Sequence, residues 1–143
     1  MEAIFNSHTH LAVWSPGSPD PDFLASAEVL RQMGKALGCR VDILGAKPLS
    51  LEVNRRLIRD FTIPYRVYRP SDSAGLEGLI IVDYARVSTP EAGQKLPVLL
   101  QIDHHQPVDG ETDSPIMILD REVGAVSTLI VEWIRDCGTE WCE

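Results

Sequence analysis

The chain has 143 residues, of which 44% are hydrophobic and 24% are charged, and its formal net charge at pH 7 is -8. This length and this composition predict a single soluble globular domain and exclude an intrinsically disordered chain. The negative charge argues against nucleic-acid binding that depends on broad neutralisation of the phosphate backbone, but it leaves open a nucleotide that is held through a bound cation. A membrane span is also excluded, because no apolar run approaches the roughly 20 residues that it needs.

The cysteines and the first residues bear on the compartment of the protein. Cys39, Cys137 and Cys142 are odd in number, and their spacing matches neither a zinc ribbon nor a CxxC pair. The first ten residues lack the basic region and the apolar region of a secretory signal. We therefore expect three free thiols and a location in the reducing cytoplasm.

The first half of the chain alternates between predicted strands and helices. Residues 11–14 form a short apolar run that predicts a strand, and the proline-rich segment after it cannot continue a ladder. Residues 23–37 carry apolar side chains at helical spacing, and Gly38 follows where a helix would end. Two further strands are predicted at 40–44 and 65–68.

A short helix is predicted between these two strands, from Ser50 to about Asp60. The Ser50 hydroxyl is expected to cap its first turn. Helical spacing places three apolar side chains toward the core, which are Val53, Leu57 and Phe61.

The second half of the chain supplies the most apolar strands and the clearest helix. Residues 78–83 and 96–100 contain unbroken apolar runs of the kind found in strands buried on both faces, and 116–119 is another candidate strand. Residues 123–137 predict an amphipathic helix, which Gly138 is expected to end. Such an alternation predicts an α/β fold, with three layers and a mostly parallel sheet that carries helices on both faces.

Acidic and imidazole side chains follow three of the predicted strands. They are Asp20 and Asp22 after the first strand, Asp83 at the end of the run at 78–83, and Asp103, His104 and His105 after the run at 96–100. The carboxyl ends of parallel strands meet at one edge of a sheet, which is where ligands bind in open α/β folds. Charged side chains at the end of a buried strand are costly unless a metal or an anion uses them. The sequence therefore predicts a metal site at this edge.

Four segments, in this order, resemble the motifs of the DHH phosphoesterase superfamily, which includes RecJ-like exonucleases and nano-RNase-like enzymes. The segments are Pro19-Asp20-Pro21-Asp22-Phe23-Leu24-Ala25-Ser26, Ile80-Ile81-Val82-Asp83, Ile102-Asp103-His104-His105 and Gly124-Ala125-Val126-Ser127-Thr128. A lone DHH tripeptide is weak evidence, whereas these four segments together span nearly the whole chain. The chain is similar to the N-terminal DHH domain alone, without the smaller C-terminal substrate-binding domain of the phosphodiesterase members.

The resemblance implies a site for two divalent cations, usually Mn²⁺, which suit carboxylate and imidazole ligands. It implies four metal ligands, which are Asp20, Asp22, Asp83 and His104. Among these, Asp83 is expected to bridge the two ions. The resemblance also implies two catalytic residues, with Asp103 orienting its neighbours and His105 lying beside the scissile phosphate.

The resemblance further implies a reaction and a substrate. Two neighbouring cations would activate water for the hydrolysis of a phosphomonoester or phosphodiester in a small nucleotide or a short oligonucleotide. The start of the last helix, with Gly124 and Ser127, would bind the substrate phosphate together with His105. The other expected partner is a missing C-terminal domain or a second chain, and a homodimer is one such arrangement.

Two departures from the family pattern bear on activity. The family has a metal-binding histidine three residues before the first Pro-Asp pair, and Pro16 stands at that position. His8 and His10 precede the first strand, so we expect them near its opposite end, where they cannot replace it. The family's last metal-binding aspartate has no counterpart before Glu143, and Asp120 is expected to cap a helix instead.

Two hypotheses therefore remain open from the sequence. The chain is either a phosphoesterase domain that belongs to a longer protein, or a degenerate, inactive domain that binds a nucleotide or serves as a scaffold. A dinucleotide-binding oxidoreductase is disfavoured, because no GxGxxG motif follows the first predicted strand.

Overall fold

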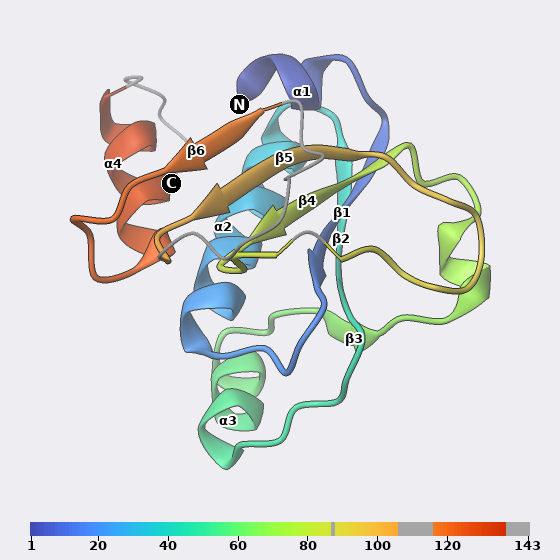
Figure 1. Cartoon of the computed structure of the whole chain (residues 1–143), viewed down its shortest axis with the longest axis horizontal. Helices are drawn as coiled ribbons and strands as arrows, with labels where there is room; N and C mark the ends of the chain where they lie inside the picture. Colours follow the sequence, from blue (N-terminus) through green and yellow to red (C-terminus); the bar gives the residue numbers. More distant parts are fainter. Residues whose placement is uncertain (87, 106–115, 137–143) are drawn as a thin grey trace.

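The computed structural model of the chain describes residues 1–86, 88–105 and 116–136, and these residues form one sheet and the helices around it (Figure 1). The sheet has six strands in the order β3-β2-β1-β4-β5-β6, and every neighbouring pair is parallel. The strands are β1 (His10–Ser15), β2 (Arg40–Gly45), β3 (Tyr65–Val67), β4 (Gly78–Val82), β5 (Val98–Asp103) and β6 (Met117–Leu119).

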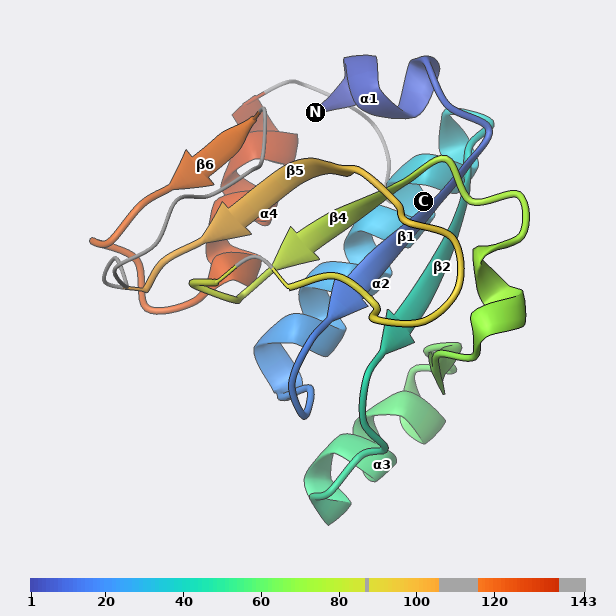
Figure 2. The ribbon, with the colours of Figure 1, turned by 45° about the vertical axis from the view of Figure 1, so that its right-hand side comes forward.

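The helices lie mainly on one face of this sheet. They are α1 (Glu2–Asn6), α2 (Pro21–Ala36), α3 (Glu52–Asp60), the short 3₁₀ helix η1 (Pro70–Ser73) and α4 (Val126–Asp136). Helix α2 contacts β2, α3 and α4, and it shares one buried apolar cluster with α4 and with strands β1, β2, β4 and β5. Figure 2 shows α2 and α4 side by side behind the strands.

The α/β class and the parallel sheet are as predicted, whereas the second face of the sheet is covered differently. Its buried cluster includes Trp14, Leu76 and Leu96, and Tyr68 and Tyr84 pack against it. Among the described residues, η1 and the loop between β4 and β5 form this layer, rather than long α-helices. Pro, Gly and Ser residues are frequent in both connections, and they favour turns over helices.

Helix α3 departs from the prediction in the side chains that it buries. Val53 and Phe61, which were expected to face the core, are 56% and 69% exposed, and Asn54 is buried instead. Leu57 packs against the core as predicted. Helix α3 contacts α2 and lies below the sheet in the view of Figure 1, so only a narrow stripe of it is covered.

The predicted cap of this helix is also wrong. The N-cap position belongs to Leu51, which makes no side-chain capping bond, and the Ser50 hydroxyl bonds to the Ser18 hydroxyl at 2.9 Å. Ser50 therefore ties the segment before α3 to the loop after β1.

The strand order places a switch point between β1 and β4. From β1 the chain continues to β2 and β3 on one side, and it then returns to place β4 on the other side of β1. Connections diverge at such a point, so a crevice opens at the carboxyl ends of the two strands. Among the described residues, no helix is both long enough and apolar enough to cross a membrane.

Candidate metal centre

A cavity of about 400 Å³ lies at the carboxyl ends of β1 and β4, at this switch point. The segment after β1 contributes one wall, and the residues after β4 and β5 contribute the other. The lining residues are Ser15, Ser18, Pro19, Asp20, Phe23, Asp83, Tyr84, Ala85, Arg86 and His105. Three of the predicted site residues, from three separate segments, therefore line one cavity.

Asp83 lies at the centre of the acidic groups around this cavity. Its side chain is 7% exposed, and its amide donates to the Ile102 carbonyl at 2.9 Å. Burial, followed by the negative charges of Asp20 and Asp22, raises the pKa of Asp83 to about 8, and a hydrogen bond with Asp20 adds to this effect. Asp83 also has a φ of +56°, a conformation that is uncommon outside glycine and is frequent at functional sites.

The two histidines after β5 face Asp83. The His104 Nε2 lies 3.4 Å from an Asp83 oxygen, and the His105 Nδ1 lies 3.8 Å from the same oxygen. One ligand atom from each of these three side chains lies within 4.8 Å of the other two. The Nδ1 of His104 is 3.2 Å from the Val123 carbonyl, which directs its other ring nitrogen toward Asp83.

Asp103, for which the resemblance implies an orienting role, lies beside His105. Its side chain is 2% exposed, and it binds the Nδ1 of His105 at 2.7 Å. This hydrogen bond is the main cause of a raised pKa at His105. Asp103 therefore fixes the orientation of the His105 ring and favours its protonated form.

Asp20 and Asp22 lie at the amino-terminal end of α2. Asp20 is the N-cap of that helix, and its Oδ1 accepts from the Phe23 amide at 2.8 Å. Asp22 bonds instead to the start of α4, where its two oxygens accept from the amides of Val126 at 2.7 Å and Ser127 at 2.9 Å. These bonds satisfy amides that a helix start otherwise leaves open.

The start of α4 therefore lies at the site, but the amides of Val126 and Ser127 already donate to Asp22. Ser127 was predicted to bind the substrate phosphate, and its amide donates to Asp22. Gly124 is exposed and has open space beside its Cα. The substrate-binding roles of Gly124 and Ser127 stay predictions. Asp120 does not cap a helix, because it accepts from the Glu122 amide in the loop before α4.

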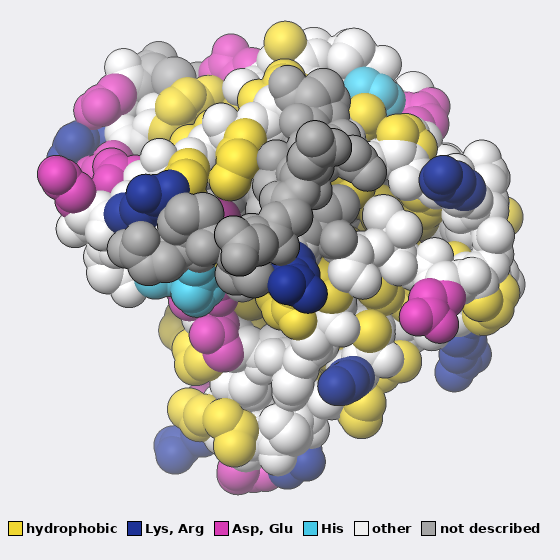
Figure 3. Space-filling view, viewed as in Figure 1, with side chains coloured by type: hydrophobic (Ala, Val, Ile, Leu, Met, Phe, Trp, Pro, Cys, Tyr) yellow, Lys and Arg dark blue, Asp and Glu magenta, His cyan; other side chains and the backbone are white. Residues whose placement is uncertain are grey.

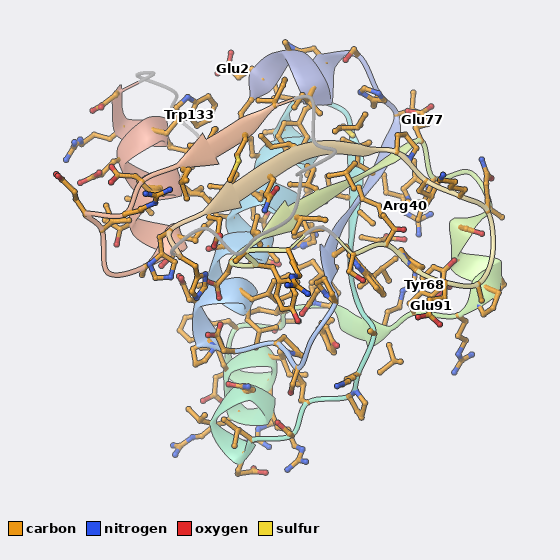
Figure 4. The ribbon with its side chains drawn as sticks, viewed as in Figure 1. Glu2, Arg40, Tyr68, Glu77, Glu91 and Trp133 are labelled. Atoms are coloured by element: carbon orange, nitrogen blue, oxygen red, sulfur yellow. The ribbon has the colours of Figure 1, made fainter. Side chains whose placement is uncertain are left out.

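The other histidines lie where the sequence placed them, at the opposite end of the sheet. His10 begins β1 and lies 3.2 Å from Asp42, and the His8 ring bonds to the Ile4 carbonyl. Figure 4 shows Glu77 and Arg40, which belong to this end, on the side of the sheet where β4 and β5 begin. Neither His8 nor His10 therefore lies where it could replace the metal-binding histidine of the DHH pattern, whose position Pro16 occupies.

Pro16 does not line the acidic cavity. Pro16 lines a different cavity, together with Trp14, Tyr68 and Glu91, on the face of the sheet opposite α2. Tyr68 and Glu91 lie next to each other in Figure 4. Ser15, the preceding residue, lines the acidic cavity instead.

Sequence reasoning missed Arg86, which lines the acidic cavity together with Asp20 and Asp83. Its side chain is exposed, and it carries the cavity's only lysine or arginine charge among the described lining residues. The signal in the sequence was its position three residues after the strand-end Asp83. Figure 3 shows histidine, acidic and basic surfaces close together on one face.

The donor set of this site fits a divalent cation. Imidazole nitrogens and carboxylate oxygens are the ligands that Mn²⁺ and similar ions accept. Asp83 remains protonated near neutral pH because it is buried and because Asp20 and Asp22 add negative charge beside it, and a cation at this point would offset that repulsion. The residues that face this point are Asp20, Asp83, His104 and His105.

Comparisons with known proteins identify the fold. No protein-family model matches the chain, and no curated protein matches it. Among solved structures, an exopolyphosphatase-related protein from Bacteroides fragilis is similar, with a TM-score of 0.60 and 18% sequence identity. The similar region covers 94% of this chain and 41% of that protein, so the chain spans less than half of its length. This likeness shows a shared fold.

The electrostatics of Asp83 predict how the metal-free protein responds to pH. The folded state holds the Asp83 proton up to a pH of about 8, whereas the unfolded state releases it near its ordinary pKa of 3.8. Stability therefore falls by several kcal/mol as the pH rises through this window. Asp83→Asn has no such proton, so urea unfolding with a chelator, at about pH 5 and about pH 8, should show a smaller fall for the variant. Equal falls in the two proteins would contradict this account of the site.

Proposed function

We propose that this chain is a metal-dependent phosphoesterase domain of the DHH type. The observation that carries the proposal is the convergence of Asp20, Asp83, His104 and His105 at the carboxyl edge of a parallel sheet. Three of the four segments that resemble the DHH superfamily supply these residues. The likeness to an exopolyphosphatase-related protein supports the hydrolysis of a phosphate linkage.

We assign Asp20, Asp83 and His104 as the principal ligands of a divalent cation, which the resemblance identifies as Mn²⁺. Asp22 is the fourth proposed ligand, because each carboxylate oxygen retains a lone pair beyond its bond to α4. When bound, such ions make water a better nucleophile and neutralise charge on phosphoryl oxygens.

The protein's own residues then bind and orient the substrate. Asp103 raises the pKa of His105 and so favours its protonated form, which is suited to donate a hydrogen bond to a phosphate oxygen. Arg86, at the rim of the same cavity, supplies a second positive donor. Phe23 and Tyr84 line the cavity with apolar surface that limits access of bulk water.

The proposed substrate is a small nucleotide or a short oligonucleotide with a phosphomonoester or phosphodiester bond. A cavity of about 400 Å³ suits a phosphate and its neighbouring sugar better than a long polymer. The net charge of -8 also disfavours a long polyanion. A C-terminal domain or a second chain, as in a homodimer, would complete the substrate site, and we propose a cytoplasmic location.

The alternative function is that of a degenerate domain that binds one ion or a nucleotide without hydrolysis. Two observations favour it. Pro16 offers no ligand and lines the neighbouring cavity, and both oxygens of Asp22 are already bonded to the start of α4. Both features reduce the number of ligands available to a second ion.

Substitution of the proposed ligands tests the principal proposal. Asp83→Asn and His104→Ala should each weaken Mn²⁺ binding by at least about 10-fold, because each removes a ligand from a small donor set. Both should abolish the hydrolysis of an aryl phosphodiester and of dinucleotides in Mn²⁺. Calorimetric titration and a chromogenic assay measure the two effects.

The control for these variants is His8→Ala, which removes an imidazole at the far end of the sheet. It should leave Mn²⁺ binding and hydrolysis unchanged. Mn²⁺ binding that is the same in Asp83→Asn, His104→Ala and the parent protein would refute the metal site. Binding without any turnover in the parent protein would favour the degenerate domain.

A second test concerns the family histidine that Pro16 replaces. Pro16→His should not increase the number of Mn²⁺ ions bound, because position 16 lines the cavity with Trp14 and Tyr68 rather than the acidic one. Metal content measured by atomic emission after gel filtration gives this number. A rise by one ion per chain would show that the loop after β1 rearranges to complete a second metal position.

A third test concerns Arg86. Arg86→Ala should raise KM for the phosphate ester by about 10-fold to 100-fold, since a hydrogen bond to a charged group contributes roughly 1.5–3 kcal/mol. Mn²⁺ affinity should not fall, because Arg86 is not a ligand. Arg86→Lys, which keeps the charge, should have a smaller effect on KM, and an unchanged KM in Arg86→Ala would exclude contact with the substrate.

A further inference from the structure

Helix α3 buries a polar residue while its apolar residues are exposed. Asn54 has no exposed surface and is the helix's fully buried residue, whereas Val53 and the flanking Leu51 and Phe61 are more than half exposed. A buried polar side chain is far more informative than an exposed apolar one, because its burial must be compensated. The contacts of Asn54 therefore indicate the role of its side chain.

Asn54 contacts the loop that carries the first acidic pair of the site. Its Nδ2 donates to the Pro19 carbonyl at 2.7 Å, across 35 positions of sequence. Pro19 is buried, and the residue after it is Asp20. The bond therefore holds the backbone immediately before a proposed metal ligand.

The hydrogen bond to Pro19 is the interaction that offsets the burial of the Asn54 amide. Among the described residues, the Oδ1 of Asn54 is buried and has no hydrogen-bond partner. A buried polar group without a partner costs roughly 1–3 kcal/mol, and an apolar side chain at this position would in turn leave the Pro19 carbonyl without this donor. The Nδ2 of Asn54, which donates to Pro19, is therefore the polar group of this side chain that is satisfied.

A second hydrogen bond joins the loop between β1 and α2 to the residues just before α3. The Ser18 hydroxyl bonds to the Ser50 hydroxyl at 2.9 Å. On the other side of Pro19, Asp20 accepts from the Phe23 amide and so joins the loop to α2. The turn that presents Asp20 and Asp22 is thus fixed from α3 and from α2.

We infer that Asn54 is a positioning residue for the metal centre, which sets the orientation of Asp20 by holding the Pro19 carbonyl. The inference rests on the proposed function, since it concerns the ligands of that same site. The hydrogen bond is local and directional, so its loss lets the Pro19–Asp20 peptide rotate without unfolding α3. Displacement of a metal ligand by even a fraction of a bond length weakens coordination.

The test compares Asn54→Leu with Leu57→Ala. Asn54→Leu keeps the number and branching of the side-chain heavy atoms and removes the donor to Pro19, whereas Leu57→Ala weakens the packing of the same helix and leaves that donor in place. Asn54→Leu should weaken Mn²⁺ binding by about 10-fold or more, the effect of removing an orienting partner. Leu57→Ala should lower the melting temperature and leave Mn²⁺ affinity close to that of the parent protein.

A second measurement is independent of the metal. Hydrogen exchange by NMR, in a chelator, reports the Phe23 amide that is bonded to Asp20 and the Ile58 amide within α3. In Asn54→Leu the Phe23 amide should exchange faster, while the Ile58 amide is unchanged. In Leu57→Ala the Ile58 amide should exchange faster.

The outcomes separate this inference from the proposed function. Failure of the parent protein to bind Mn²⁺ would refute the metal site, and the exchange of Phe23 would still decide whether Asn54 positions the loop. Unchanged Phe23 exchange in Asn54→Leu overturns the inference. Mn²⁺ affinity that falls equally in Asn54→Leu and Leu57→Ala also overturns it, because it would show a merely structural role.

Discussion

The structure around the site depends on one electrostatic constraint, which is the burial of Asp83 among other carboxylates. Its side chain is 7% exposed, and this burial, together with the negative charges of Asp20 and Asp22, raises its pKa to about 8. Such an arrangement is unfavourable unless positive groups offset it. His104 and His105 lie within 4 Å of Asp83, and the charge of His105 provides part of that compensation, which a cation would complete.

The same constraint explains how helix α4 is attached. Asp22 accepts hydrogen bonds from the amides of Val126 and Ser127, so the positive end of α4 offsets its charge. The Val123 carbonyl, just before that helix, bonds to the ring of His104. Segments that are about one hundred positions apart thus stabilise each other through site residues, and the geometry of the proposed ligands is coupled to the packing of α4 on α2.

The sequence predicted most of the strands and the edge at which the site lies. Asp83 follows an unbroken apolar run, and Asp103, His104 and His105 end another, so both had to emerge at the carboxyl edge of parallel strands. The prediction from the sequence was wrong for α3, where helical spacing indicated Val53 and Phe61 as core residues and both are exposed. Spacing shows which residues share a face, but it does not show whether a neighbour covers that face.

What the sequence determined by itself was therefore the periodic and local part of the structure. Apolar runs, helix stops and strand-end acids depend on neighbouring residues, and these gave the α/β class and the identity of the acidic cluster. Tertiary structure alone decided that Asn54 is buried against Pro19, that Asp22 bonds to α4, and that Pro16 lines a separate cavity. Each of these outcomes depends on a contact between segments distant in sequence, for which the chain carries no local pattern.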